Sequence, residues 1–373
     1  MDLFKNFAKV TVSTGYDASA TSIALSAGHG ARLPAAPFNA SWWNDTDYPD
    51  PSDDPNVEIV RITAIASDTL TVTRAQESTS ATTKNTASKT YRMIAGLTAK
   101  TFNTDLGATL AQQSNGRLTL ASGDPGFDAF DVTAATTIYF TPFKGNVISL
   151  YDGANWIAHS FSEISLALGT LTSGKNYDVF IYSNAGTPTL EFSAAWASDS
   201  ARTDAISFQN GIYVKSGTPT RRFLGTFRTT STTTTEDSML KRFLWNVDNQ
   251  IIRRAFKDIP GTHTNSTPSW QMYNADAANK IEVIVGKPVA ANVGFSGAIT
   301  GVSGVVNYIA VGINQTSGPT GSFAFGNAAT TVVQGVFSQP IELSLGYSAI
   351  NLIEYTAGSA ALQGASIAAT LFS

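Results

Sequence analysis

Apolar and polar residues alternate with a period of two along most of this chain, a pattern typical of β-strands with one buried face. Residues 57–65 and 70–74 are β-branched runs separated by the turn residues Ser67 and Asp68, which predicts a hairpin. Other paired runs flank Asp-Gly or Gly-Thr-Pro segments and predict hairpins in the same way. They are 147–151 with 156–157, 177–182 with 190–192, and 211–214 with 222–225.

The alternation continues through the last third, in residues 281–285, 341–345 and 367–371, and favours a sandwich or jelly roll. Residues 293–313 carry no charge and are long enough to cross a bilayer. Five glycines, together with serine, threonine and asparagine, make that segment a poor membrane helix. We therefore expect a glycine-punctuated pair of strands there, and no membrane insertion.

One stretch has a helical period. Between residues 97 and 113, Phe102, Leu106 and Leu110 repeat at every fourth position, and Gly116 can end the run. The apolar stripe is too narrow to be buried alone inside a globule. It suits a connector that packs on a neighbouring domain or on symmetry mates.

The sequence thus predicts an all-β protein with several β-sandwich or barrel domains, jelly-roll-like in type, and one short helical connector. We expect an N-terminal barrel, the connector, a middle sandwich and a jelly-roll-like C-terminal tip. Their boundaries are 1–96, 97–116, 117–250 and 258–373. The low charge of the tip alone sets it apart from the rest.

Charge is distributed very unevenly. From Lys287 to the end there is no further Lys or Arg, and residues 258–373 hold seven charged residues, about 6 % of that segment. A free-standing domain usually has roughly a quarter. A surface of Ser, Thr, Asn, Gly and Ala suits packing against copies of itself, a scaffold or a saccharide.

Composition excludes several classes of protein. The net charge is −4 and the pI about 5.4, so no basic stripe for nucleic acid and no polybasic membrane anchor is expected. The chain has no cysteine and three scattered histidines, so we expect no disulfide, no zinc site and no cofactor. No signal peptide is expected at the N-terminus.

Two stretches resemble modules of tailed-bacteriophage virion proteins. Residues 36–39, 47–51, 54–63 and 70–77 resemble an N-terminal module of phage fibres and other virion proteins. Residues 137–146, 150–153, 213–217, 221–226, 232–237 and 242–246 resemble a β-rich module of phage structural proteins. Together they cover about residues 30–250. The resemblance implies a structural virion component, trimeric and fibre-like, without enzymatic residues.

Adjacent Trp42 and Trp43 point to opposite faces of a strand, so we expect one in the core and the other against a neighbouring virion protein. The loop that follows is rich in carboxylates and prolines. Its acidic residues are Asp45, Asp47, Asp50, Asp53 and Asp54. They could ligate Ca²⁺, but they lack the spacing of an EF-hand, and solvated turns are the simpler interpretation.

Three basic pairs adjoin aromatic residues and invite a nucleic-acid interpretation, Arg221–Arg222, Lys241–Arg242 and Arg253–Arg254. Nearby acids favour ion pairing between subunits instead, and we expect no nucleic acid as a partner.

In the tip, the polar loop 262–273 carries Trp270 and Tyr273, which suit binding of a host saccharide. Tyr308, Tyr347 and Tyr355 could serve likewise, although such a tyrosine more often completes a core with its hydroxyl at the rim. The acids of the tip show no paired arrangement for glycoside hydrolysis, so no enzyme is expected, although a depolymerase site split between chains stays open.

The sequence therefore predicts a virion protein, a homotrimeric tail or head fibre. Its N-terminus would anchor to tail, portal-proximal or capsid proteins, and its tip would bind the host surface. A capsid decoration protein and a fibre or baseplate adaptor are the alternatives.

Overall fold

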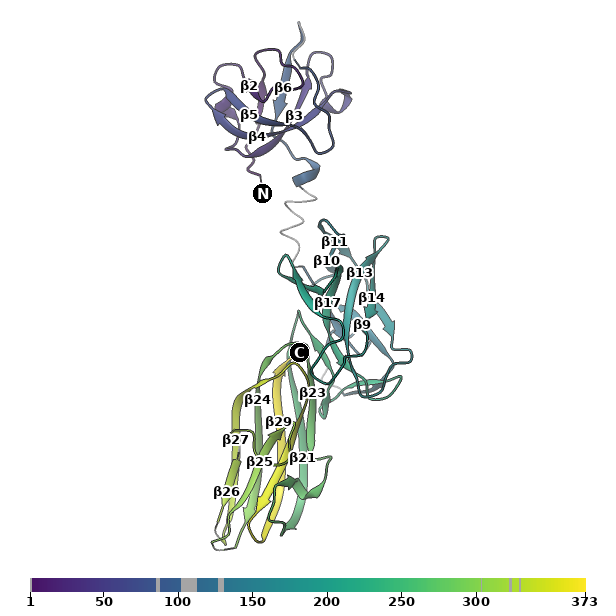
Figure 1. Ribbon diagram of the computed structural model, residues 1–373, viewed down its shortest axis with the longest axis vertical. Coiled ribbons are helices and arrows are strands. Elements are labelled where there is room, and N and C mark those ends of the chain that lie inside the picture. Colours follow the sequence, from purple (N-terminus) through teal and green to yellow (C-terminus); the bar gives the residue numbers. More distant parts are fainter. Residues whose placement is uncertain are drawn as a thin grey trace. The chain divides into compact units, whose positions relative to one another are not determined.

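The computed structural model describes residues 2–84, 88–101, 113–126, 131–302, 304–321, 324–328 and 330–373. The chain is all-β, as the alternation predicts (Figure 1). It divides into two compact units, one of residues 1–111 with 155–157 and one of residues 112–154 with 158–373. The predicted helical stripe of Phe102, Leu106 and Leu110 lies outside the described residues, and Gly116 begins a strand.

The first unit contains one antiparallel sheet in the order β1-β6-β3-β4-β5-β2. Its strands are β1 (Lys9–Thr11), β2 (Ser22–Ala24), β3 (Phe38–Asn44), β4 (Glu58–Ala66), β5 (Thr69–Gln76) and β6 (Tyr91–Ile94). Two single-turn 3₁₀ helices, η1 (Gly30–Arg32) and η2 (Pro51–Asp53), lie in its loops.

The two edges of this sheet meet and close it into the predicted barrel. A bridge pairs Val12 with Leu25, and backbone N–H groups of Ser13 and Ser26 donate to Ala24 and Thr11 at 3.0 and 2.9 Å. Closure leaves no free sheet edge for unwanted pairing. Alternate residues fill the interior, which is why the period of two is so clear in β4 and β5.

The second unit begins with two small sheets and one larger one. The small sheets are β12 (Ile164–Ala167), β9 (Thr137–Pro142) and β7 (Gly116–Thr119) in that order, and the pair β10 (Val147–Tyr151) and β11 (Trp156–Ser160). The larger sheet has the order β14 (Thr187–Phe192), β13 (Asn176–Asn184), β17 (Thr218–Arg228), β16 (Ile212–Lys215) and β15 (Ile206–Gln209), and β20 (Leu244–Asn246) pairs with β17.

All four predicted hairpins form, but two of their turns are tighter than the sequence indicated. Strand β13 turns into β14 through Ala185 and Gly186, both with positive φ, as a two-residue hairpin turn requires. Pro188 therefore lies inside β14. It is tolerated there because β14 is the edge strand and needs no N–H on its outer side.

Two further sheets continue the second unit. An eight-stranded sheet follows the order β26 (Ala324–Asn327), β25 (Asn307–Ile313), β28 (Gly346–Thr356), β23 (Lys280–Val285), β19 (Lys241–Arg242), β18 (Thr235–Asp237) and β8 (Val132–Ala135), and β22 (Gln271–Met272) pairs with β28. A four-stranded sheet has the order β21 (Ile252–Asn265), β29 (Ala360–Phe372), β24 (Val289–Thr300) and β27 (Val332–Leu343). The 3₁₀ turn η4 (Tyr273–Ala275) precedes β23.

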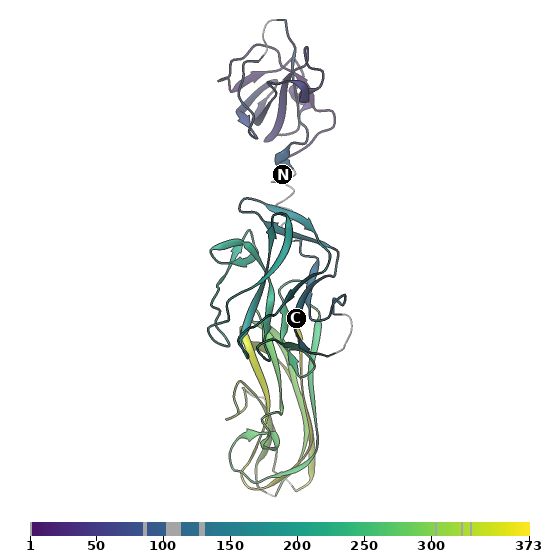
Figure 2. The same cartoon turned by 90° about the vertical axis from the view of Figure 1, so that its right-hand side faces the viewer.

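These two sheets pack as a sandwich of long strands (Figures 1 and 2). The uncharged segment 293–313 contributes β24 to one sheet and β25 to the other, so it forms the expected pair of strands. Among the described residues, no helix is both long and apolar enough to span a membrane.

The expected boundary between middle sandwich and tip falls inside continuous structure. Strand β21 runs through residues 252–265, and the eight-stranded sheet takes β8, β18 and β19 from one side of that boundary and β23, β25 and β28 from the other. One hydrophobic core includes Phe180, Phe223 and Trp245 with the sandwich residues. The described parts of residues 112–154 and 158–373 therefore form one compact unit.

A buried ion pair strengthens this junction. The Arg202 guanidinium contacts both Asp178 carboxylate oxygens at 2.7 and 3.2 Å and donates to the carbonyl oxygen of Gly286 at 2.8 Å. Its flat face lies 4.5 Å from the Trp196 ring centre and 5.2 Å from that of Phe223. Arginine suits this position because it combines two-pronged hydrogen bonding with stacking.

Candidate functional site

Three half-exposed aromatic rings gather on the outer side of the eight-stranded sheet. Trp270, in the loop before β22, stacks on Tyr308 of β25 and lies tilted against Tyr355 of β28, with ring centres 5.9 and 5.4 Å apart. We call these three residues the aromatic patch. Tyr308 and Tyr355 are cross-strand neighbours in register, so the sheet itself holds the two tyrosines side by side.

A buried polar group anchors the loop that carries Trp270. Glu354, fully buried on the inner side of β28, lies 2.6 Å from the His263 Nε2 and accepts a hydrogen bond from Gln271 at 2.8 Å. His263 comes from β21 in the opposite sheet, so this contact joins both layers of the sandwich. The loop therefore presents Trp270 from a fixed base.

Tyr273, the other aromatic predicted for saccharide binding, needs correction. Its side chain is 2 % exposed and packs in the core, edge-on to His263 at 4.7 Å. Burial, with the Glu354 carboxylate nearby, raises the pKa of Tyr273. The chain turns inward at η4, so only Trp270 of the predicted pair has a ring at the surface. Tyr308 and Tyr355, not Tyr273, are the aromatic neighbours of Trp270 at the surface. Both point outward because alternate residues of a strand face opposite sides of the sheet.

Tyr347 points toward charged neighbours instead. Its hydroxyl donates to Glu282, and the Arg228 guanidinium lies 4.0 Å from its ring centre. Burial and the Glu282 carboxylate raise its pKa. Tyr347 therefore serves an internal contact of the second unit.

The outer side of the four-stranded sheet is flat and almost uncharged. Core residues of β21, β24, β27 and β29 alternate with small outward ones around a shallow hollow of about 410 Å³. These outward residues, which we call the neutral face, are Asn292, Gly294, Ser296, Val336, Ser338, Ser366, Ala368 and Thr370. Arg254, whose guanidinium lies over the Phe256 ring, lines the hollow, and Asp258 of β21 lies exposed opposite Ser366.

Strand β27 ends this sheet and is the most exposed long strand of the tip. It pairs with β24 over its full length, and Val336 at its middle is 86 % exposed. Long apolar edge strands normally carry charges that prevent pairing with other chains. Here the twelve residues hold one charge, Glu342.

Trp42 and Trp43 do point to opposite faces of β3, but both are buried. Trp42 fills the barrel. The indole N–H of Trp43 donates to the carbonyl oxygen of Tyr48 at 3.1 Å, because the acidic loop folds back over the ring. The expectation of Trp43 as an exposed anchor for a virion protein is thereby corrected.

The aspartates of that loop do not converge on one point. Four of them each bind different partners, which are cations, side-chain donors or backbone N–H groups. The partners are Lys9 and Arg92 for Asp45, Lys89 and Asn44 for Asp47, Ser52 for Asp50, and the N–H groups of Asn44 and Asn56 for Asp54. Within the described ranges, no group of three or more His, Cys, Asp or Glu residues could hold a metal ion. The loop is a set of capped turns.

Five of the six residues in the basic pairs form ion pairs within the chain, and the sixth, Arg254, lies over the Phe256 ring. Their partners are Glu191 for Arg221, Asp248 for Arg222, Glu236 for Lys241, and Asp237 for both Arg242 and Arg253. Asp237 thereby links β18, β19 and β21. Neutralised side chains of this kind offer little to a phosphate backbone.

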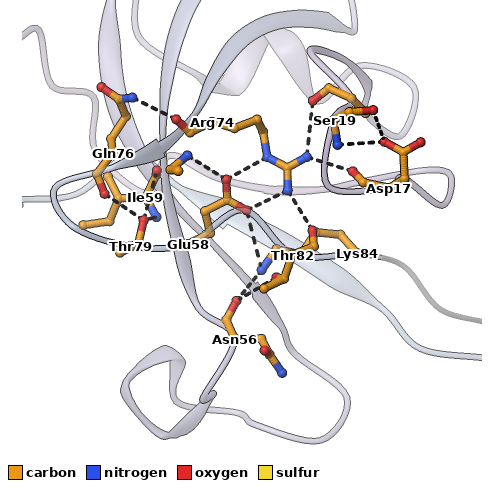
Figure 3. Close-up of polar contacts among 12 residues, drawn as sticks. Asp17, Ser19, Asn56, Glu58, Ile59, Arg74, Gln76, Thr79, Thr82 and Lys84 are labelled. Atoms are coloured by element: carbon orange, nitrogen blue, oxygen red, sulfur yellow. Dashed lines mark hydrogen bonds and ion pairs between the residues drawn. The ribbon is translucent and has the colours of Figure 1, made fainter.

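A buried ion cluster joins Glu58 of β4, Arg74 of β5 and Lys84 (Figure 3). Both Glu58 oxygens accept hydrogen bonds from Arg74 at 2.7 Å, and the Lys84 ammonium lies 3.9 Å away. Burial alone would raise the pKa of Glu58, but the hydrogen bonds from Arg74 and Ala75 hold it below its usual range. Burial lowers the pKa of Lys84 to about 8.

This cluster closes the barrel interior. Arg74 and Lys84 flank the buried Trp42 ring, at 4.9 and 5.9 Å from its centre. Lys84 also donates to the carbonyl oxygen of Asn56. Its three charged groups contact one another and the backbone inside the unit, which makes its role structural.

No protein-family model and no curated protein matches this sequence. Among solved structures, it is similar to T=1 particles derived from infectious bursal virus, with a TM-score of 0.25 and 14 % identity over 73 % of each chain. The structure of the infectious bursal disease virus Gx strain has a TM-score of 0.23 and 13 % identity, over 70 % of this chain and 73 % of that one. An insecticidal delta-endotoxin from Bacillus thuringiensis has a TM-score of 0.18 and 6 % identity, over 70 % of this chain and 55 % of the toxin chain. TM-scores this low establish no shared fold, so the functional argument depends on the residues of the chain.

Proposed function

We propose that this chain is a structural protein of a tailed-bacteriophage virion, which assembles through the neutral face and contacts a host saccharide with the aromatic patch. The observation that carries the proposal is the neutral face, eight uncharged residues of one sheet that lie beside Arg254 and Asp258, on a segment that has few charges. Single-copy proteins normally cover such a surface with ionised side chains.

Small residues favour a symmetric contact. Serine, alanine, glycine and threonine let two sheets approach closely without unpaired charges becoming buried. A threefold arrangement would cover three such faces at once, so a homotrimer is the proposed assembly. The resemblance of residues 30–250 to phage virion modules supports a place in the particle for the rest of the chain.

The aromatic patch is the proposed contact with the host. Its three rings lie at the surface, and a sugar ring presents an apolar face that packs well on an aromatic one. We propose binding without cleavage, because Glu354 and Glu282 of the tip are both engaged, by His263 with Gln271 and by Tyr347 with Lys280. Release of reducing ends from host polysaccharide would contradict that part.

The saccharide contact is tested by Trp270→Ala on a bacterial glycan array. Losing the ring should weaken binding roughly tenfold or more, as the loss of a stacked aromatic contact implies. Phe372→Ala is the matched control, since that ring is 53 % exposed at the end of β29 and outside the patch. Equal binding by the two variants would reject the patch as the contact.

Placement in the particle is tested by immunogold labelling of purified virions. Label at the tail or at a head fibre supports the proposal. Label spread evenly over the capsid would indicate a decoration protein instead of a fibre. Label at a joint between tail and fibre would indicate an adaptor. Absence from purified virions would remove the virion role altogether.

A further inference from the structure

A cleft in the second unit lies away from both surfaces described above. It has a compartment of about 300 Å³ lined in part by Tyr213, Arg222, Asp248 and Lys287. A neighbouring compartment of about 150 Å³ shares Tyr213, Phe223, Val247 and Lys287 with it. The lining comes from β16, β17, the end of β20 and the segment between β23 and β24, so the site exists only in the folded unit.

The larger compartment is polar. Arg222 is 2 % exposed, and carbonyl oxygens of Gln113 and Ser149 hold its guanidinium at 2.9 Å each. It also reaches Asp248 at 3.2 Å, whose side chain is 42 % exposed at the mouth. Asp248 is therefore fixed by a buried cation and offers its remaining lone pairs to the cleft.

Lys287 supplies a charge with no partner. Its ammonium lies 6.0 Å from the Tyr213 ring centre, and no carboxylate of the described chain comes within ion-pair distance of it. The other two cations that line this cleft, Arg202 and Arg222, pair with Asp178 and Asp248, so Lys287 is the one without a carboxylate among the described residues. A bound anion would pair with the Lys287 ammonium, which is partly shielded from water in the cleft.

The smaller compartment is apolar. Ile206, Trp245, Val247, Pro288 and Leu345 line it, and Arg202, at its wall, is committed to Asp178 and Gly286. It has room for a small apolar substituent and not for a long chain. Tyr213, between the two compartments, presents its ring to both.

We propose that this cleft binds an acidic saccharide unit, a hydroxylated ring that bears a carboxylate. The carboxylate pairs with Lys287, the ring packs on Tyr213, hydroxyls donate to Asp248, and an acetyl-sized group enters the apolar compartment. A fatty acid would fit less well, because its chain would lie against Arg222 and Asp248. The cleft is a site for a monosaccharide unit, distinct from the aromatic patch.

The test uses the full-length chain and ligand-observed NMR titrations. The probes are D-glucuronate and N-acetylneuraminate, with D-glucuronamide as the uncharged counterpart of the first. We expect saturable binding of at least one acid, about tenfold weaker binding of the amide, and about tenfold weaker binding of the acid by Lys287→Met. Lys287→Arg should keep the affinity within about threefold.

Lys280→Met is the matched control, because Lys280 is a part-exposed lysine of the same unit that pairs with Glu282 at 3.2 Å. It should bind as the unchanged protein does. Absence of saturable binding by both acids, or equal binding by the two methionine variants, overturns the proposal. So does binding that Trp270→Ala abolishes and Lys287→Met leaves intact. The titration needs no virion, so its failure leaves the assembly proposal standing.

Discussion

At the scale of residues, buried charge in this protein is matched locally. Glu58 and Asp178 are fully buried carboxylates, and each receives a two-pronged contact from one arginine, Arg74 or Arg202. The cost of burying these ions is offset because further hydrogen bonds satisfy the remaining oxygens. The hydrogen bonds hold the pKa of Glu58 below its usual range, whereas burial still raises the pKa of Asp178 and lowers that of Lys84, so these two groups retain part of the cost.

Lys84 makes the stability of the barrel depend on pH. Its pKa is about 8 in the folded protein and near 10.5 when exposed, so between these values the unfolded chain binds the extra proton. Stability should therefore rise with pH across this window, by roughly 1–3 kcal/mol. Lys84→Met should lack that rise in calorimetric melts at pH 7 and pH 10. Parallel pH profiles of the two proteins would show that the folded Lys84 titrates normally.

Tyr273 buries a hydroxyl that has no hydrogen-bond partner among the described residues. Removing that oxygen should cost nothing, so Tyr273→Phe is expected to be neutral or stabilising by about 0.5–1 kcal/mol in urea unfolding. Tyr273→Ala should lose about 3 kcal/mol or more through the cavity it leaves. A large loss in the phenylalanine variant would reveal an essential role for the hydroxyl.

At the scale of elements, the sequence predicted the features that depend on residues close to one another in the chain. Hairpins such as β4–β5 and β13–β14 are visible because their period of two and their turn residues lie within twenty positions of each other. The burial of Trp43 could not be predicted, because it depends on the fold-back of a loop whose prolines and aspartates read simply as solvated.

The candidate sites show the same division. Trp270 could be singled out from a polar loop, but its association with Tyr308 and Tyr355 needs two strands brought into register from distant positions. The cleft at Lys287 gave no local signal at all, since four separate segments build it. Ion pairing of the basic residues within the chain likewise depends on non-local strand order.

The acidic loop should need no metal. Four of its aspartates are already held by cations, N–H groups or side-chain donors of the same unit. Treatment with a chelator should leave the melting temperature unchanged within about 1 °C, because a ligand-dependent site would contribute stability by mass action. A fall that added Ca²⁺ reverses would restore the calcium hypothesis for this loop.

The neutral face should be sensitive to a single charge. Thr370 lies exposed on β29, a central strand of the sheet, so Thr370→Lys would bury an ammonium in any contact made there. We expect this variant to lose the assembly at concentrations where Thr187→Lys, exposed on the distant strand β14, retains it. Light scattering measures both, and matching melts would confirm that each folds. Assembly unaffected by Thr370→Lys would place the interface elsewhere.

At the scale of the whole molecule, charge is concentrated where it is paired, in the barrel and around β13 to β21. It is almost missing from the strands after Lys287. The second unit takes in residues 112–154 and 158–373, and one hydrophobic core joins its sheets, so this surface poor in charge is part of a larger folded unit. Covering the neutral face with another copy explains why a surface so poor in ions is retained on a stable sandwich.

The most direct measurement is sedimentation equilibrium of the full-length chain over a wide range of concentrations. One chain has a mass of 39.4 kDa, and the account predicts a single closed oligomer, three times that mass for a trimer, that persists on dilution to the low micromolar range. A mass of 39.4 kDa at every concentration, with the neutral face exposed to water, would contradict it.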